Sequence, residues 1–247
     1  MDTREIGLVL YTVRDRAAED FERTLREVAA IGYGAAELCG TFGMEAAALR
    51  ELGEEIGLKF PSAHVGLPEL SDTFDETVAY YGRVGVEAIV IPALPGDRTE
   101  SVEAWRKTAA ELSGLGARLK AQGMALLYHN HAAELEPMGG MCGWDILVAE
   151  GDPESLGFEV DVYWAAYGGR DPLAALRAVR GRVPYVHAKD MAADRSMTEV
   201  GSGTLDFPEF AAAREELGAR TFYVEHDEPA PPSIESARIS FEYLRGL

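Results

Sequence analysis

The sequence is poor in cysteine and in basic residues, and each shortage excludes a class of protein. Only Cys39 and Cys142 occur among 247 residues, with no CxxC pair, so neither a disulfide framework nor a cysteine zinc site is expected. Lys and Arg number 23 against 42 Asp and Glu, and the resulting net charge of −19 would repel a phosphate backbone. We therefore expect no nucleic-acid partner.

Long apolar runs are also lacking. No stretch reaches the roughly 18 apolar residues that a membrane span needs. The opening residues, MDTREIGLVLYTVRD, place acidic side chains before a short apolar run and do not follow the pattern of a signal peptide. These features predict no membrane partner and a cytoplasmic location. Because no linker, low-complexity run or charge block divides the chain, we expect one domain over 1–247.

Short apolar runs rich in β-branched residues alternate with segments of helical spacing. We expect eight strands, within 6–12, 34–40, 58–64, 87–93, 124–131, 156–162, 183–189 and 221–227. Glycines should close several helices ahead of the next strand, as at Gly32, Gly57, Gly85 and Gly123. Eight strand–helix units at a spacing of roughly 30 residues predict an α/β fold, a single (β/α)8 TIM barrel. A doubly wound sheet fits less well because no GxGxxG or P-loop follows the first strand.

The five histidines share one position in this pattern. Each lies at or just past the C-terminal end of an expected strand: His64, His129, His131, His187 and His226. In a barrel these strand ends share one face, and active sites form on that face. Histidines with purely structural roles would not be expected to cluster in this way.

Strand alternation indicates which neighbouring side chains join them. Residues two apart point to the same side of a strand, and the apolar set should face the helix layer. This predicts that Glu159 with Asp161, His187 with Lys189, and Glu225 point into the barrel. A cluster of carboxylates and imidazoles without a thiolate suits a divalent ion. Mn²⁺, Mg²⁺, Co²⁺ and Zn²⁺ are the candidate ions. The ion would also let neighbouring carboxylates ionise together.

Several motifs resemble one known family. The stretches YHNHAAEL, FEVDVYWAAYGGRDPL, VPYVHAKDM, VGSGTLDF and YVEHD are similar to the sugar phosphate isomerase/epimerase group. These xylose-isomerase-like TIM barrels also include relatives of endonuclease IV and inosose dehydratase. The similarity runs over nearly the whole chain. It implies a divalent metal held by side chains from the ends of strands five to eight, with adjacent substrate oxygens chelated to it.

The resemblance also implies roles for individual residues. Asp161 matches the aspartate of strand six, His187 the histidine of strand seven, and Glu225 the glutamate of strand eight. The fifth strand departs from the pattern, because His129 stands where many epimerases carry a glutamate. His129 is therefore the expected fourth ligand, and Glu134 in the following loop is its rival.

The expected chemistry is proton transfer beside a carbonyl. A metal would polarise the carbonyl and the neighbouring hydroxyl and stabilise an enediolate. Glu225 or His129 is the expected base, and Lys189 or His64 the expected proton donor. Return of the proton to the same carbon gives epimerisation and to the next carbon isomerisation, whereas loss of a β-hydroxyl gives dehydration.

Other residues are candidates for contact with substrate. Besides His131 and Glu134, the sequence offers Trp164 as a stacking platform for a sugar face, although aromatic residues beside a barrel more often serve packing. Glu37 ends the second strand and either touches substrate or caps a loop. Arg14 either binds a phosphate or hydroxyl or forms a surface salt bridge. The segment GSGT at 201–204 is too short to form a phosphate cradle. His226 alternates with Glu225, so it should either support the site residues from behind or be structural.

The leading functional prediction is a metal-dependent isomerase or epimerase of a sugar or keto-sugar. A dehydratase or lyase acting on a keto-sugar or inosose is the closest rival, favoured by histidine in the fifth strand. A DNA-repair enzyme like endonuclease IV would need more metal-binding histidines and a basic groove, and the net charge of −19 counts against it. A non-catalytic sugar-binding protein would not need convergent ligands. The expected partner is a small carbohydrate, and a homo-oligomer is left open.

Overall fold

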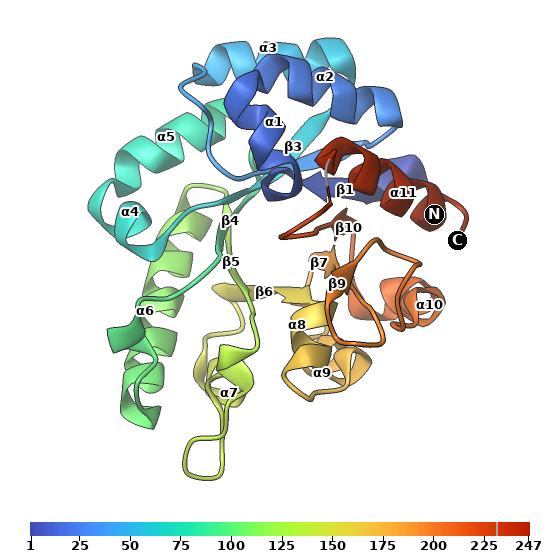
Figure 1. Ribbon diagram of the computed structural model, residues 1–247. Coiled ribbons are helices and arrows are strands. Elements are labelled where there is room, and N and C mark those ends of the chain that lie inside the picture. The colour runs from blue at the N-terminus through green and yellow to red at the C-terminus, as the bar shows by residue number, and fades with distance from the viewer. Residues whose placement is uncertain (231) are drawn as a thin grey trace.

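The computed structural model describes residues 1–230 and 232–247. Within this part, eight parallel strands close into a barrel in the order β1, β10, β7, β6, β5, β4, β3, β2, with helices packed around the outside (Figure 1). The barrel strands are β1 Ile6–Val9, β2 Ala35–Leu38, β3 Lys59–His64, β4 Ala88–Ile91, β5 Ala125–His129, β6 Leu156–Asp161, β7 Tyr185–Ala188 and β10 Thr221–Val224. The predicted (β/α)8 barrel is confirmed.

The helices alternate with these strands. They are α1 Arg14–Glu19, α2 Phe21–Ile31, α3 Ala46–Ile56, α4 Leu67–Asp72, α5 Phe74–Val84, α6 Val102–Ala121, α7 Gly143–Glu150, α8 Val162–Tyr167, α9 Pro172–Ala178, α10 Phe207–Leu217 and α11 Ser233–Arg245. Gly32, Gly57 and Gly85 cap α2, α3 and α5 with positive φ, and Gly123 follows α6 in the same way. Among the described residues, no helix has both the length and the apolar character required to cross a bilayer.

Short 3₁₀ turns and one hairpin complete the chain. The turns are Thr3–Glu5, Leu10–Val13, Gly96–Arg98 and Ala133–Leu135. The first strand is therefore shorter than expected, because the chain leaves the barrel after Val9 and turns towards α1. A small antiparallel hairpin, β8 Asp190–Met191 and β9 Met197–Thr198, lies beyond the end of β7 and was not predicted.

The barrel has an apolar layer on each side of its wall. Alternate residues such as Val186, Ala188 and Val224 face outwards and pack against the helices. Inside, a separate cluster fills the lower barrel, formed by Val9, Ala35, Ala88, Val90, Leu127, Tyr185 and Tyr223. Gly7 of β1 leaves room for the Tyr223 ring, since a Cβ there would overlap the ring. The alternation predicted from the sequence is thus confirmed, and the upper barrel is left to polar side chains.

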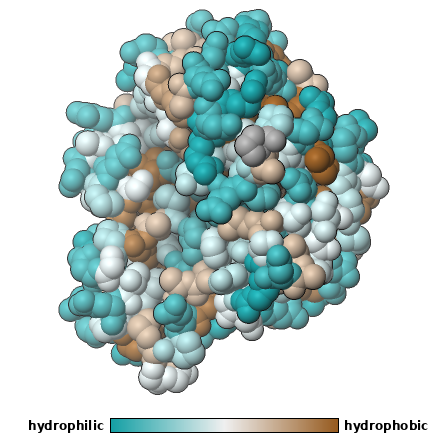
Figure 2. Space-filling model, in the orientation of Figure 1, coloured by the Kyte–Doolittle hydropathy of each residue, from teal (hydrophilic) through white to brown (hydrophobic). Residues whose placement is uncertain are grey.

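The outer surface carries most of the charge. Hydrophilic side chains predominate on the face shown in Figure 2, and hydrophobic ones form scattered patches between them. This distribution agrees with the excess of 42 acidic over 23 basic residues. It leaves the interior of the barrel as the place where buried polar groups gather.

Candidate active site at the barrel mouth

Polar side chains from most of the strands converge at the C-terminal end of the barrel. A cavity of about 400 Å³ opens there, lined by Tyr11, Cys39, His64, Pro92, Ala93, His129, His131, Glu225 and Asp227. Parallel strands place all their C-terminal ends on this face, so residues far apart in the sequence meet at one point.

His187 lies at the centre of the cluster and is fully buried. Its Nδ1 lies 2.8 Å from Glu225 Oε2, and its Nε2 lies 2.9 Å from both Glu37 Oε1 and Glu159 Oε2. Burial alone would lower the pKa of His187, but the charges of Glu159 and Glu225 outweigh it and hold the pKa well above its usual value. The imidazole is thus oriented by carboxylates on both sides.

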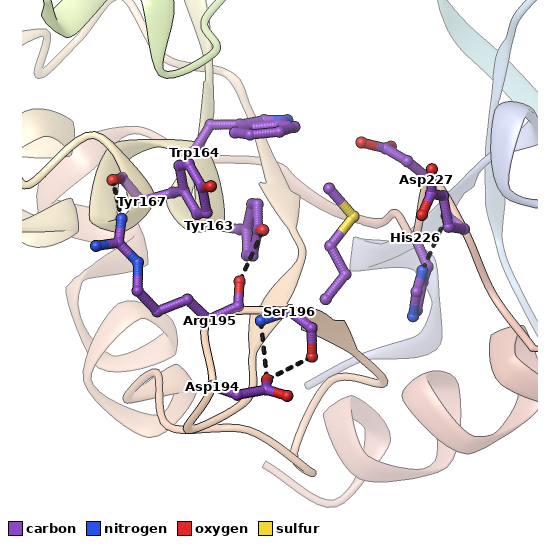
Figure 3. Close-up of a pocket in the computed structure, with 10 residues that line it drawn as sticks. Tyr163, Trp164, Tyr167, Asp194, Arg195, Ser196, His226 and Asp227 are labelled. Atoms are coloured by element: carbon purple, nitrogen blue, oxygen red, sulfur yellow. Dashed lines mark hydrogen bonds between the residues drawn. The ribbon is translucent and has the colours of Figure 1, made fainter.

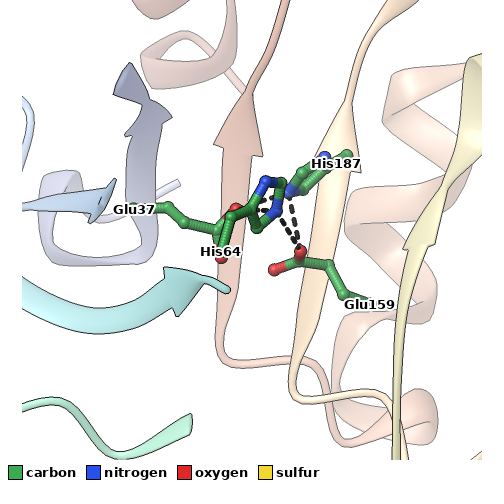
Figure 4. Close-up of side chains that lie close together, drawn as sticks. All are labelled: Glu37, His64, Glu159 and His187. Carbon is green, nitrogen blue, oxygen red and sulfur yellow. Dashed lines mark hydrogen bonds and ion pairs between the residues drawn. The ribbon is translucent and has the colours of Figure 1, made fainter. Parts of the chain in front are cut away.

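A lower layer of the site consists of Glu37, His64, Glu159 and His187 (Figure 4). His64 Nε2 lies 2.8 Å from Glu37 Oε1 and 3.3 Å from Glu159 Oε2. Burial and the neighbouring Glu37 charge together raise the pKa of Glu159. Glu37 Oε2 and Glu159 Oε1 are buried without a hydrogen-bond partner. This layer holds the Nε2 side of His187 and leaves Nδ1 to face the upper layer.

The upper layer consists of His129, Asp161, His187 and Glu225, each of which offers one potential ligand atom. These four atoms lie within 4.8 Å of one another. His129 Nδ1 is buried without a hydrogen-bond partner, as expected for an atom that a ligand would engage. Burial and the nearby His187 lower the pKa of His129 well below its usual value, so its imidazole is neutral. Two imidazoles and two carboxylates are a donor set that fits a divalent ion.

Lys189 closes one side of the upper layer and is buried. Its Nζ lies 3.1 Å from Asp161 Oδ2, 2.8 Å from Glu225 Oε2 and 2.9 Å from Asp227 Oδ1. Burial would lower the pKa of Lys189, but the three carboxylates outweigh it and raise the pKa above its usual value. The ammonium group is therefore a fixed positive charge beside the candidate ligands.

Glu134 lies in the loop after β5 and is buried, but it stands outside the cluster. Its Oε1 accepts a 2.6 Å hydrogen bond from the Tyr128 hydroxyl, and its Oε2 accepts a 2.8 Å bond from the His131 backbone N–H. Both oxygens are thus occupied in shaping the loop. This position argues against the expectation that Glu134 is the rival metal ligand or a substrate contact.

With this geometry in place, comparison with known proteins identifies the family. A family model described as the xylose isomerase-like TIM barrel matches residues 25–247. The chain belongs to that family. The family predicted from the sequence motifs is therefore confirmed.

Relatives of this xylose isomerase-like barrel include an inosose dehydratase from Geobacillus kaustophilus, which is 27% identical over 195 residues. The match covers 70% of this chain and 63% of the relative, so the chain spans less than two thirds of the relative's length.

Solved structures confirm the fold. A sugar phosphate isomerase/epimerase from Parabacteroides distasonis superposes with a TM-score of 0.87 at 22% identity, covering 99% of this chain and 94% of that one. The IolI protein with a bound zinc atom superposes with a TM-score of 0.76 at 16% identity, covering 98% of this chain and 97% of that one. At these identities the two structures establish the shared fold alone.

Other predicted residues of the xylose isomerase-like barrel take different positions. His131 lines the mouth, with its ring 4.7 Å from that of His129. Trp164 lies beside it, with its ring 5.3 Å from His131. Glu37 lies in the lower layer rather than at the substrate surface. Arg14 donates hydrogen bonds to the carbonyls of residues 11 and 227 at the rim, so it does not point into the cluster.

Three residues of the site received no role from the sequence. Glu159 lies two residues before Asp161, and Asp227 lies two residues after Glu225. The strand alternation that points Asp161 and Glu225 into the barrel therefore also predicts that Glu159 and Asp227 point inward. Asn130 Oδ1 accepts a 3.0 Å hydrogen bond from the backbone N–H of Asp161 and thereby positions this candidate ligand of strand six. No sequence pattern indicates this contact, because it joins two strand ends through a side chain.

Proposed function

We propose that this chain is a divalent-metal-dependent enzyme that transfers a proton on the carbon beside a carbonyl of a sugar or keto-sugar, as an isomerase or epimerase. The convergence of His129, Asp161, His187 and Glu225 within 4.8 Å carries this proposal. A non-catalytic sugar-binding protein would not require such a donor set. The net charge of −19 argues against a nucleic-acid substrate.

The four upper-layer side chains would hold the ion. When bound, a divalent ion supplies an electrophile for a substrate carbonyl and its neighbouring hydroxyl. Mn²⁺ is the proposed ion, and the zinc-bound IolI structure makes Zn²⁺ the first alternative. The lower layer would keep the His187 ring in place through its Nε2, which is the role that carboxylates commonly play behind histidine ligands.

Neighbouring side chains supply the proton transfer. Glu225 and His129 were the bases expected from sequence, but as ligands both would have their facing atoms engaged. His131 lines the cavity beside them without belonging to the ligand cluster, so it is placed to accept the proton. Lys189 and His64 flank the site from other strands. The Lys189 ammonium is placed to stabilise the oxygen that gains charge, and His64 to donate a proton to it.

Dehydration of a keto-sugar or inosose is the second candidate. The relative from Geobacillus kaustophilus carries the name inosose dehydratase. The fifth strand also ends in His129 instead of a glutamate, which departs from a two-glutamate epimerase site. An imidazole base at His131 opposite a proton donor at His64 would suit the loss of a hydroxyl group as water.

The reaction is tested with ketoses, 3-keto-glycosides and inososes, incubated with Mn²⁺ in deuterated water and followed by NMR. Deuterium in a recovered or epimerised sugar supports proton transfer, while an unsaturated product supports dehydration. If no sugar turns over and abasic DNA is cleaved instead, the proposal is overturned.

The metal site is tested by measuring bound Mn²⁺ with mass spectrometry. We expect no bound Mn²⁺ in the variants Asp161→Ala and His187→Ala, because each substitution removes a proposed metal ligand. Asp97→Ala is the matched control, since the Asp97 side chain is 74% exposed and lies outside the site. Full metal content in either ligand variant would remove that residue from the proposed set.

A further inference from the structure

A second cavity of about 840 Å³ lies next to the mouth, and the proposed reaction does not use it. We call it the annex. Its walls come from α8, from the β8–β9 hairpin and from the segment after β10 (Figure 3). Asp227 lines both cavities, so the annex and the mouth adjoin each other. A ligand that occupies both cavities would pass Asp227.

One wall of the annex is aromatic and comes from a single helix. Tyr163, Trp164 and Tyr167 of α8 line it. The Tyr163 and Tyr167 rings are stacked with centroids 5.6 Å apart, and the Trp164 ring meets Tyr167 edge-on at 5.5 Å. Tyr167 is 41% exposed, so part of its ring faces the cavity. Aromatic rings offer the C–H face of a sugar an apolar surface of matching size.

The aromatic wall is held in position without a ligand. The Tyr163 hydroxyl donates a 3.0 Å hydrogen bond to the Arg195 carbonyl, and the Arg195 guanidinium lies 4.5 Å above the Tyr167 ring. Arg195 adopts a left-handed backbone with φ of 71°, which turns the hairpin tip towards α8. The annex is therefore a preformed cavity, which reduces the entropy lost when a ligand binds.

The opposite wall is polar and acidic. Asp194, Asp227 and Glu228 line it together with Ser196, and carboxylates are good acceptors for sugar hydroxyl groups. Among the described residues that line the two cavities, Arg195 is the only arginine or lysine, and its guanidinium also donates to the Tyr167 carbonyl. A phosphate group in the annex would meet a surplus of negative charge.

Backbone N–H groups near the hairpin already donate hydrogen bonds within the protein. Gly201 and Gly203 donate 2.9 Å and 3.0 Å hydrogen bonds to Asp190 Oδ2. Such convergent N–H groups elsewhere bind phosphate. Here an internal carboxylate fills that place, so the glycine segment after the hairpin offers no cradle for a phosphorylated substrate.

We infer that the annex binds a second, uncharged sugar ring, so that the substrate is an unphosphorylated glycoside whose reacting ring lies at the barrel mouth. This inference rests on the proposed function for the reacting ring. It adds the class of substrate: a ring packed against Trp164 and the exposed part of Tyr167, with its hydroxyl groups facing Asp194 and Ser196.

Binding without turnover tests the annex separately from the reaction. Isothermal titration of the Mn²⁺-loaded protein should compare glucose, cellobiose and glucose 6-phosphate. We expect cellobiose to bind at least about tenfold more tightly than glucose, and glucose 6-phosphate no more tightly than glucose. Equal affinity for glucose and cellobiose, or a preference for the phosphate, would overturn the inference. Failure of the sugar panel to react would instead overturn the proposed function.

Variants of Tyr167 test whether the preference for cellobiose arises in the annex. Tyr167→Ala should remove the advantage of cellobiose and leave glucose binding unchanged, whereas Tyr167→Phe should retain it. Phe42→Ala is the matched control, because Phe42 is 49% exposed and lines neither cavity. A cellobiose preference that survives in Tyr167→Ala would show that the second ring binds elsewhere and would refute the assignment.

Discussion

Replacing Lys189 with methionine should destabilise the metal-free protein by about 3–5 kcal/mol, the usual cost of breaking a buried ion pair. Methionine has nearly the length of lysine but lacks the charge. Lys189 Nζ lies within 3.1 Å of carboxylate oxygens of Asp161, Glu225 and Asp227, and the lysine is buried. The variant would leave those carboxylates without their shared cation.

The stability lost in Lys189→Met should increase as the pH rises. Burial raises the pKa of Asp161 from 3.8 to about 7 and outweighs the opposing attraction of Lys189. An acid with a raised pKa in the folded state costs stability as pH rises from its unfolded value through its folded value, here from about 4 to about 7. Without Lys189 this pKa rises further. The difference between wild type and Lys189→Met should therefore be larger at pH 8 than at pH 5.

Urea unfolding followed by circular dichroism, with EDTA present, measures both effects. Lys120→Met is the matched control, because Lys120 is 58% exposed and its pair with Glu154 should be worth less than about 1 kcal/mol. Addition of Mn²⁺ should restore part of the stability of Lys189→Met if an ion binds Asp161 and Glu225. Equal losses in the two lysine variants, or a larger loss at pH 5 than at pH 8, would refute the reasoning.

Three further predictions concern the scaffold. Glu134→Gln should lower the free energy of unfolding by about 1–2 kcal/mol by weakening two loop hydrogen bonds, with bound Mn²⁺ unchanged; a loss of metal would contradict its placement outside the cluster. Gly116→Ala should cost more than about 2 kcal/mol because its Cβ would overlap the Ser155 carbonyl, whereas Gly114→Ala in the same helix meets open space and should stabilise by about 0.5–1 kcal/mol. Tyr33→Phe removes a buried hydrogen bond to a carbonyl of α11 and should cost about 1 kcal/mol in urea unfolding; no change would mean that this bond contributes nothing net.

The barrel and the inward-facing residues could be predicted because both depend on local pattern. Apolar runs that alternate with helical segments specify the strand order of a right-handed parallel barrel. Within β7, the outward Val186 and Ala188 fix the inward direction of His187 and Lys189, since a strand has a period of two. The same rule predicts that Asp161 and Glu225 point inward, although it does not say which residues they contact.

The loops could not be predicted in the same way, because their structure depends on contacts that have no period. Glu134 follows two histidines and reads as a ligand, but the hydroxyl of Tyr128 and a backbone N–H occupy its carboxylate. The sequence predicts that Trp164 stacks on a sugar or packs beside the barrel, but it does not predict the cavity that the β8–β9 hairpin forms in front of this residue. That hairpin forms around Asp190, which accepts hydrogen bonds from Gly201 and Gly203, more than ten residues further along the chain.

The anchoring of this hairpin has a consequence for how proteins of this fold diversify. The Asp190 carboxylate accepts bonds from the backbone N–H groups of Met191, Gly201, Gly203 and Leu205. Since these bonds use main-chain atoms, side chains at the tip, residues 192–196, can change while the anchor stays. Natural variation or directed evolution confined to those five positions should alter which molecules the annex accepts and preserve the side chains at the strand ends, so a mutational library there tests how the annex selects its ligand.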